Sequence, residues 1–336
     1  MTQSASLPLS RVPDPRDAPV LRWAVLGPGW IARRFVESLH RHTTQTVVAV
    51  GSRSPERARA FADEHGVDRA HGTYEAVFAD DDVDIVYIAT PHTEHLANAL
   101  DAIAAGKHVL VEKPLAVDAV GAARIAEAAR SAGVFAGEAM WTRFLPKFDV
   151  IEQVLRSGVL GPIHTVLADH GEFFTTDHRI YDPALAGGPL LDLGTYVASF
   201  AYSVLGAPET VDARSRPAND EIDGQISALL TGESGHAVLN TTILTNTPTT
   251  AVVCGRDGTL TIAGPFFMPG PFTVALRDGI TLAYDETPGL QVDGLHLAAV
   301  EAARRISVGE VESAVHPLAD AVATLEIIDR IRERIS

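Results

Sequence analysis

The fold of this chain is decided by the stretch Val109-Leu110-Val111-Glu112-Lys113-Pro114-Leu115. Its three leading apolar residues indicate a buried strand, and the acid, lysine and proline that follow cannot continue the pairing of a sheet. In open α/β sheets, ligands bind in the crevice beyond the carboxyl ends of the strands. We therefore predict that Glu112 and Lys113 lie at the mouth of such a sheet.

Around this stretch, strand-like and helix-like segments alternate. The strands are predicted at 22–26, 46–52, 70–71, 84–89 and 109–111, and the helices at 31–42, 55–65, 73–78, 93–105 and 118–132. Helices of this length between strands are typical of a parallel sheet with helices on both faces. The first part of the chain is therefore predicted to be a doubly wound α/β domain.

After Trp141 the pattern changes to apolar segments of period 2 joined by short turns. Strands are predicted at 163–169, 210–214, 226–231, 236–242, 251–254, 259–262, 272–276 and 280–284, and helices at 146–157, 190–205, 293–308 and 318–335. This pattern predicts an α+β domain with a mostly antiparallel open sheet.

Composition limits the classes of partner. With 27 basic and 43 acidic residues the net charge is −16, which argues against nucleic acid or an anionic membrane. No apolar run reaches the length of a membrane span, and the proline-rich start predicts a loose tail over residues 1–20. The single cysteine, Cys254, excludes an internal disulfide and is expected to be a buried thiol. We predict a cytoplasmic protein.

A glycine turn follows the first predicted strand, as Gly27-Pro28-Gly29-Trp30-Ile31-Ala32. In this G-x-G-x-x-A pattern Gly27 permits the tight turn, Gly29 lets a pyrophosphate approach the backbone, and Ala32 keeps the helix close to the strand. An accidental glycine turn is the alternative. The position at the first strand of a βαβ series favours a dinucleotide site. We expect the cofactor to contact Gly27, Pro28, Gly29, Trp30 and Ile31.

The end of the second predicted strand bears on the choice of nucleotide. Sites for NAD usually have an acid there, whereas this chain has Ser52-Arg53-Ser54, with Arg57 one helical turn further on. Arg53 would attract the 2′-phosphate that an acid repels, although a solvated arginine is the alternative. We predict NADP, with NAD less favoured, bound by Ser52, Arg53 and Arg57.

The loop Thr90-Pro91-His92 and the nearby His95 are expected to flank the cofactor, together with Glu112 and Lys113. Two histidines at this spacing could bind a metal, but no placed cysteine or carboxylate completes a set of four ligands, so we predict no metal site. Lys113 at the strand edge could stabilise a developing alkoxide. The alternative is a surface ion pair made by Glu112.

Three motifs occur in order along the chain: the glycine turn, Glu112-Lys113-Pro114, and the later run Gly187-Gly188-Pro189-Leu190-Leu191-Asp192-Leu193-Gly194-Thr195-Tyr196. Together they resemble the glucose–fructose oxidoreductase/inositol dehydrogenase family, from about residue 22 onward. The resemblance implies a Rossmann domain over 21–142 and a substrate-binding and oligomerisation domain over 143–336. It also implies hydride transfer between a nicotinamide cofactor and a sugar, polyol or related small molecule, in a homodimer or higher homo-oligomer.

The run Gly137-Glu138-Ala139-Met140-Trp141-Thr142-Arg143-Phe144 is similar to a segment of the dimeric dihydrodiol dehydrogenases and NADP-dependent D-xylose dehydrogenases. In those enzymes a tyrosine stands where inositol dehydrogenases have the catalytic histidine. The resemblance therefore implies Tyr196 as acid/base and Lys113 as its electrostatic partner. It places Trp141, Arg143 and His170 in the substrate pocket.

The chemistry of the residues agrees with this assignment. A phenol has a pKa near 10 and needs a nearby cation to act as a base, which Lys113 could supply. Asp192 and Tyr196 are four residues apart on one predicted helix, so Asp192 would position a substrate hydroxyl or the lysine. A half-buried core tyrosine is the alternative for Tyr196.

The chain departs from its relatives at Pro189, at His170 and at His92, where they usually have alanine, phenylalanine and asparagine. These departures bear on substrate preference. We predict an NADP-dependent dehydrogenase that acts on a secondary alcohol of a sugar, polyol or trans-dihydrodiol. The alternatives are a ketose or anhydro-sugar carbonyl reductase that runs in the opposite direction, and a non-catalytic NADP(H)-sensing regulator.

Overall fold

The computed structural model describes residues 6–335, which form two compact units. The first unit comprises Pro13–Phe144 and Leu290–Val322, and the second comprises Leu145–Gly289 with residues 6–12 and 323–335. No helix of the described residues is long and apolar enough to cross a membrane.

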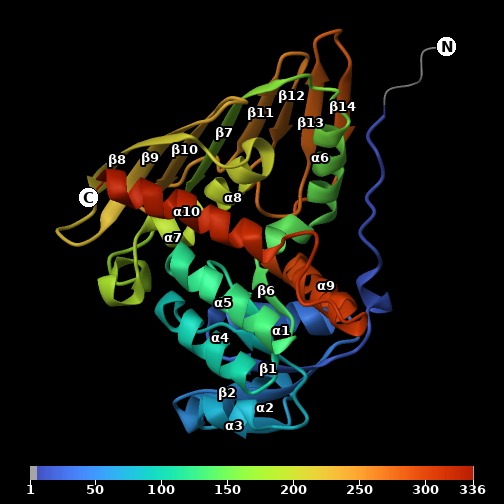
Figure 1. Ribbon diagram of the computed structural model, residues 1–336, viewed down its shortest axis with the longest axis vertical. Coiled ribbons are helices and arrows are strands. Elements are labelled where there is room, and N and C mark those ends of the chain that lie inside the picture. The colour runs from blue at the N-terminus through green and yellow to red at the C-terminus, as the bar shows by residue number, and fades with distance from the viewer. Residues whose placement is uncertain (1–5, 336) are drawn as a thin grey trace. The chain divides into compact units, whose positions relative to one another are not determined.

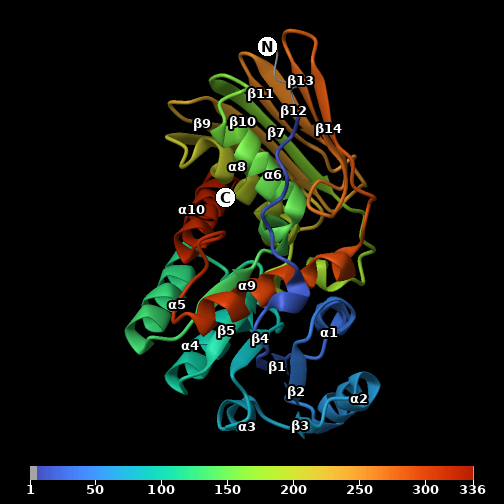
Figure 2. The same ribbon diagram turned by 90° about the vertical axis from the view of Figure 1, so that its right-hand side faces the viewer.

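A six-stranded parallel sheet forms the centre of the first unit, in the order β3-β2-β1-β4-β5-β6. Its strands are β1 (Arg22–Leu26), β2 (Thr46–Gly51), β3 (Arg69–His71), β4 (Ile85–Ile88), β5 (His108–Glu112) and β6 (Ala136–Ala139). Its first helices are α1 (Trp30–His42), α2 (Pro55–His65), α3 (Tyr74–Phe78), α4 (His95–Ala104) and α5 (Ala119–Ala132). Helices α4 and α5 cover one face and α1 and α2 the other (Figure 2), as right-handed crossovers require. The predicted doubly wound domain is confirmed.

Local sequence explains these elements. Helix α1 buries Ala32, Phe35, Val36 and Leu39, the spacing of one helical face, against the sheet. Helix α2 begins at Ser54, whose side chain accepts a hydrogen bond from the Arg57 amide, and it ends at Gly66 in the left-handed conformation.

Strand β6 was not predicted. Its sequence, Ala-Gly-Glu-Ala, has neither β-branched residues nor alternation, and it is a strand because it pairs with β5 along its length. The Ala136 amide also donates to the carbonyl of Val311, so a segment distant in sequence lies along its start.

The predicted domain boundaries differ from the structure at residues 290–322. These residues were placed in the second domain but belong to the first unit. They contain the short helix η6 (Gln291–Asp293) and α9 (Leu295–Ser307). The Ser38 hydroxyl in α1 donates to the Val292 carbonyl at 2.6 Å and lies 2.9 Å from Nδ1 of His296. Sequence could not show this attachment, because it joins residues more than 250 positions apart.

Eight strands form the sheet of the second unit, in the order β14-β13-β12-β11-β7-β10-β9-β8. They are β7 (Ile163–Gly171), β8 (Thr210–Pro217), β9 (Asp223–Thr231), β10 (His236–Thr242), β11 (Ala251–Gly255), β12 (Gly258–Ile262), β13 (Phe272–Leu276) and β14 (Thr281–Tyr284). All pairings are antiparallel except that of β7 with β10. The prediction of a mostly antiparallel sheet is confirmed. Helices α6 (Pro146–Arg156) and α8 (Gly194–Leu205) lie on one face (Figure 1), and α10 (Leu318–Ile335) ends the chain.

The helix predicted at 190–205 is divided, which corrects the expectation that Asp192 and Tyr196 share one regular helix. Asp192 ends α7 (Pro189–Asp192), Tyr196 lies in α8, and Leu193 stands between them. The Tyr196 amide bonds to the carbonyl of Leu193, three residues back, so the regular four-residue repeat is interrupted.

The predicted loose tail is only partly correct. Residues 1–5 lie outside the described part, but Arg11 donates from its backbone and its guanidinium to Asp149 of α6. The side chain of Gln153 donates to the Leu9 carbonyl, and Pro15–Asp17 form the helical turn η1. The part of the tail near α6 is therefore held by hydrogen bonds.

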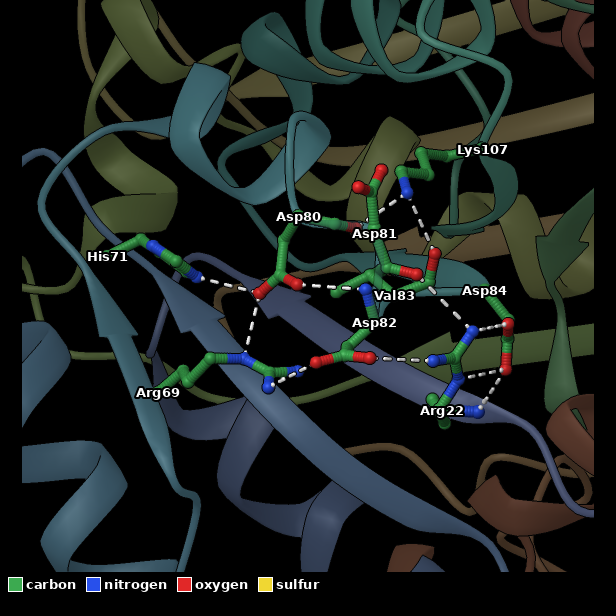
Figure 3. A network of polar contacts seen from close by, with 9 residues as sticks. All are labelled: Arg22, Arg69, His71, Asp80, Asp81, Asp82, Val83, Asp84 and Lys107. Carbon is green, nitrogen blue, oxygen red and sulfur yellow. Dashed lines mark hydrogen bonds and ion pairs between the residues drawn. The ribbon is translucent and has the colours of Figure 1, made fainter.

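The amino ends of the parallel strands are joined by a polar network (Figure 3). Arg22 at the start of β1 makes three hydrogen bonds to the carboxylate of Asp84, at 2.6–3.1 Å. Arg69 of β3 pairs with Asp80 at 2.8 Å, and the Lys107 ammonium donates to the carbonyls of Asp80 and Val83. This edge of the sheet is filled by structural contacts. The candidate site therefore falls at the opposite edge.

Candidate active site

Three predicted site segments meet at the carboxyl edge of the sheet in the first unit. Strands β1, β4 and β5 are parallel neighbours, with Leu26 opposite Ile88 and Ile88 opposite Val111. The glycine turn, the Thr90 loop and Lys113 follow these strand ends directly. The structure therefore brings together the cofactor segments that sequence had placed on separate strands.

The glycine turn has the space that a dinucleotide needs. Gly27 has φ +80°, and a β-carbon there would lie 2.8 Å from the Ala89 carbonyl oxygen, so only glycine fits. A β-carbon at Gly29 would meet nothing nearer than 3.9 Å. No side chain caps α1 at Gly29, whereas Ser54 caps α2. An open turn before an uncapped helix start fits a pyrophosphate.

The side chains around the turn differ in exposure. Trp30 is 59% exposed and Ile31 is partly buried at the start of α1, while Pro28 is buried. The helix-facing residue, Ala32, is fully buried. The exposed side chains of this turn can therefore reach a ligand without disturbing the core.

Two arginines stand exposed beyond β2. The side chain of Arg53 is 69% exposed, with its nearest guanidinium nitrogen 3.6 Å from a carboxylate oxygen of Glu94, and Arg57 is also exposed. Ser52 is buried, and its hydroxyl accepts from the Ser54 amide. This arrangement fits an added phosphate on the adenosine ribose.

The structure gives His95 a different environment from the predicted one. Its side chain is fully buried, with Nδ1 2.8 Å from the Pro114 carbonyl oxygen and Nε2 2.9 Å from that of Thr90. Both ring nitrogens are therefore engaged with backbone, and neither can contact a cofactor or a metal. His92 is buried with its ring edge-on to His95, and Thr90 accepts from Asn98.

Glu112 is buried rather than part of a surface ion pair. The Tyr87 hydroxyl donates to one carboxylate oxygen, and the Lys113 amide donates to the other at 3.1 Å. Burial raises the pKa of Glu112 to about 7, against the hydrogen bond from Tyr87 and the charge of Lys113. The Lys113–Pro114 bond, undecided from sequence, is cis. Tyr87 was missed because its strand, Ile85–Ile88, has only a core pattern.

In the second unit, Tyr196 lies in an aromatic cluster with His170 and Phe267. Its ring stacks on Phe267 at 4.6 Å between centroids, and the His170 ring lies 5.5 Å from Tyr196 and 4.5 Å from Phe267. Nε2 of His170 is 2.9 Å from a carboxylate oxygen of Glu172. Phe267 had no sequence signal, because its loop approaches α8 only in the folded unit.

The remaining predicted residues have identifiable surroundings. Asp192 forms an ion pair of 3.1 Å with Arg179, to which sequence had assigned no specific role. In the first unit, Trp141 and Arg143 lie on the turn η3 (Trp141–Phe144), with Trp141 buried and Arg143 partly buried.

Comparisons with known proteins agree with this geometry. Residues 21–139 match the model described as an oxidoreductase family with an NAD-binding Rossmann fold, and residues 148–261 match the GFO/IDH/MocA C-terminal domain. The fold and the turn at β1 thus define a nicotinamide-dinucleotide oxidoreductase. The chain belongs to the GFO/IDH/MocA family, as its motifs predicted.

Curated relatives cover nearly the whole chain. The trans-1,2-dihydrobenzene-1,2-diol dehydrogenase of Bos taurus is 33% identical over 94% of this chain and 97% of the relative. That of Oryctolagus cuniculus is 35% identical over 93% of this chain and 97% of the relative. The resemblance to dihydrodiol dehydrogenases is therefore confirmed, and the chain is an NAD(P)-dependent oxidoreductase.

Solved structures show the same architecture. A mutant of a 3-ketoreductase from Actinomadura kijaniata, in complex with TDP-benzene and NADP, has a TM-score of 0.83 at 26% identity, over 94% of this chain and 98% of that one. An aldose-aldose oxidoreductase from Caulobacter crescentus, complexed with glycerol, has a TM-score of 0.84 at 25% identity, over 94% and 97%.

Proposed function

We propose that this protein is an NADP-dependent dehydrogenase that oxidises a secondary alcohol of a cyclic diol, sugar or polyol. The observation that carries the proposal is the common edge of β1, β4 and β5, where an open glycine turn follows β1 and Lys113 follows β5, with only β4 between them. Relatives of more than 30% identity named dihydrodiol dehydrogenases support the substrate class.

The first unit would hold the cofactor through residues of the chain already described. Backbone amides at the start of α1 would bind the pyrophosphate, and Arg53 and Arg57 would bind the 2′-phosphate. The loop at Thr90 and the residues Glu112 and Lys113 would flank the nicotinamide. When bound, NADP supplies the hydride acceptor for the substrate carbon.

Tyr196 is proposed as the acid/base for the substrate hydroxyl, and Lys113 as the cation that stabilises its phenolate. A phenol with a pKa near 10 is a weak base at neutral pH, so a positive charge close to it is required. Lys113 would also stabilise negative charge on the substrate oxygen. Asp192 would orient a hydroxyl, with Arg179 holding the carboxylate in place at 3.1 Å.

The aromatic cluster of Tyr196, His170 and Phe267 supports a flat or cyclic substrate. Phe267 stacks on both of the other rings at 4.5–4.6 Å, and the buried His170 is held by Glu172. Trp141 and Arg143, in the first unit, are the further residues proposed to bind a ring-shaped diol or sugar.

The test is the variant Tyr196→Phe, compared with Tyr202→Phe on the same helix. Loss of the proton acceptor should lower kcat by about 10²–10⁴-fold, with NADPH binding near wild type. Oxidation would be followed by NADPH absorbance with cyclic dihydrodiols, pentoses and hexoses, and cofactor binding by fluorescence. Wild-type turnover in Tyr196→Phe would remove the tyrosine from its role. If the wild type showed no turnover with any of these substrates, in either direction, the non-catalytic sensing regulator would be favoured.

We also propose that the protein forms a homodimer through the outer face of the sheet in the second unit. One row across four neighbouring strands consists of Leu229, Val238, Leu167 and Val252, and three of them are 37–47% exposed. The next row contains Thr231, His236, Thr165 and Cys254, and the row on the other side contains Ser227, Asn240 and Asp169, so the apolar row lies between two polar rows. A second copy presents the same surface, which is self-complementary about a two-fold axis.

A further inference from the structure

A single peptide group after Lys113 is held at both of its ends by buried side chains. The Pro114 carbonyl oxygen lies 2.8 Å from Nδ1 of His95, and the Leu115 amide donates to Oε1 of Glu138 at 2.8 Å. These two groups belong to the same peptide plane. The backbone that follows Lys113 is therefore fixed in rotation as well as in position.

Glu138 is a buried acid for which the proposed reaction has no use. It is 2% exposed, at the carboxyl end of β6, and its second oxygen lies 2.7 Å from Nε2 of His316. His316 is 2% exposed and lies before α10, in the segment whose Val311 carbonyl accepts from Ala136. An isolated buried carboxylate is costly, and the hydrogen bonds to Leu115 and His316 offset that cost for Glu138.

A proton on each ring nitrogen would let His95 donate in both of its contacts. Both partners are carbonyl oxygens, which only accept, so a neutral ring would set a lone pair against one of them at less than 3 Å. Burial is the strongest influence and leaves the pKa of His95 below its ordinary value, against the two carbonyls and the charge of Glu138, and the charge of Lys113 lowers it further. The ring of His92 is the other titratable group in contact. Burial thus opposes a charge on His95, whereas its two carbonyl acceptors favour the doubly protonated ring.

We propose that His95 and Glu138 are positioning residues for Lys113, acting as a buried imidazolium and a buried carboxylate that clamp the Pro114–Leu115 peptide between them. The carbonyl end of the peptide dipole faces the positive ring and the amide end faces the negative carboxylate, so both contacts are charge-assisted. The inference rests on the proposed role of Lys113.

The clamp would matter for catalysis because the lysine side chain is long. Its ammonium can be placed accurately only if the backbone of Lys113 is held in a fixed position. A shift of about 1 Å in a catalytic group can cost about 100-fold in rate. His95 ties the turn to the end of β4, and Glu138 ties it to β6. The backbone that carries the Lys113 side chain is thus held by both strands that neighbour β5, and not by a loop alone.

The charge of His95 is tested on the wild-type protein. Nitrogen NMR of ¹⁵N-histidine-labelled protein with bound NADP, assigned by the loss of one ring in His95→Gln, reports which ring nitrogens carry hydrogen at pH 7. We expect both His95 nitrogens to be protonated. A proton-free nitrogen on that ring would overturn the charged clamp.

Kinetics test the positioning role. Glu138→Ala removes the acceptor and the charge, and Glu138→Gln keeps an acceptor for the Leu115 amide without the charge. We expect kcat to fall by about 100-fold in the alanine variant and less in the glutamine variant, with the KM for NADP within about two-fold of wild type and the pH profile of kcat displaced. The matched control is His296→Gln, which alters another buried histidine of the same unit, bonded to Ser38.

Lys113→Met separates this inference from the proposed function. If Lys113→Met keeps its activity, the role of the lysine fails and the clamp fails with it. If Lys113→Met is inactive while both Glu138 variants fold and keep the wild-type kcat and pH profile, only the clamp is wrong. If Glu138→Ala does not fold, the glutamine variant and the NMR measurement decide.

Discussion

Arg53 is the residue on which the cofactor preference depends most directly. It is exposed beyond β2, and its ion pair with Glu94 is long at 3.6 Å. Arg53→Ala should raise the KM for NADP by about 10- to 100-fold, because a charge-assisted contact to the 2′-phosphate is lost, and change that for NAD by less than about three-fold. Steady-state kinetics with both cofactors measure this. Arg59→Ala, on the outer side of α2, is the control, and equal losses for both cofactors would contradict the assignment.

Lys147 is a second residue with a testable consequence. Its side chain is fully buried in the second unit, its ammonium has no hydrogen-bond partner among the described residues, and it lies 5.7 Å from the Phe148 ring centroid. Burial lowers the pKa of Lys147 to about 8, against the charge of Glu286. The unfolded chain therefore binds a proton that the folded protein releases between pH 8 and 10.5.

It follows that folding stability should rise with pH through that window, since the unfolded state holds more protons there. Lys147→Met should stabilise the protein at pH 7, by about 1–3 kcal/mol, and flatten the rise between pH 8 and 10.5. Urea denaturation at several pH values measures both effects. A less stable Lys147→Met at pH 7 would show that the ammonium makes a favourable interaction.

At the scale of elements, the network at the amino edge of the parallel sheet is the clearest stabilising feature (Figure 3). Burial opposes ionisation of Asp84, but the hydrogen bonds from Arg22 lower its pKa below 3.8. The stability from this pair is therefore present at neutral pH and lost as the pH falls below 3.8.

Asp84→Asn should cost about 2 kcal/mol at pH 7, and the difference from wild type should shrink below pH 4. The control is Asp81→Asn, which removes the same charge from the same loop. Arg22 donates to the backbone carbonyl of Asp81, at 3.4 Å, so this substitution should leave the free energy of unfolding nearly unchanged. Thermal unfolding of both variants at pH 7 and 3.5 checks this. Equal losses at neutral pH would mean that net charge, and not the Arg22 contact, sets the stability.

Elements were predicted best where local sequence was sufficient. Helix α2 has its cap at Ser54 and its stop at Gly66, and β10 and β13 alternate clearly, so their bounds agree with the structure. Strand β6 and the division at Leu193 were missed, because pairing to β5 and the local turn of α7 decide them. A four-residue strand without alternation has no local signal.

For the whole molecule, the proposed dimer face gives the remaining prediction. Val238→Asp places a charge in the centre of the apolar row, and it should weaken a homodimer at least about 100-fold, so that the variant sediments as a monomer. Cys254, which is half-buried on this face and not fully buried as expected, should react faster with thiol reagents in that variant.

The control for the dimer is Val120→Asp, an exposed valine on α5 of the first unit, which should leave the assembly unchanged. Sedimentation velocity over a range of concentrations measures the state of each protein. A wild type that sediments as a monomer, or a Val238→Asp variant that remains dimeric, would contradict the assignment of this face.

By itself, the sequence determined the doubly wound first unit, the mostly antiparallel second sheet, the glycine turn and the family, because periodicity, caps and turn residues are local properties. Only the tertiary structure decided that residues 290–322 join the first unit, that Phe267 stacks on Tyr196, and that Glu138 and His95 hold the peptide after Lys113. These contacts join positions far apart in the chain, where the energy of packing and buried hydrogen bonds leaves no periodic trace in the sequence.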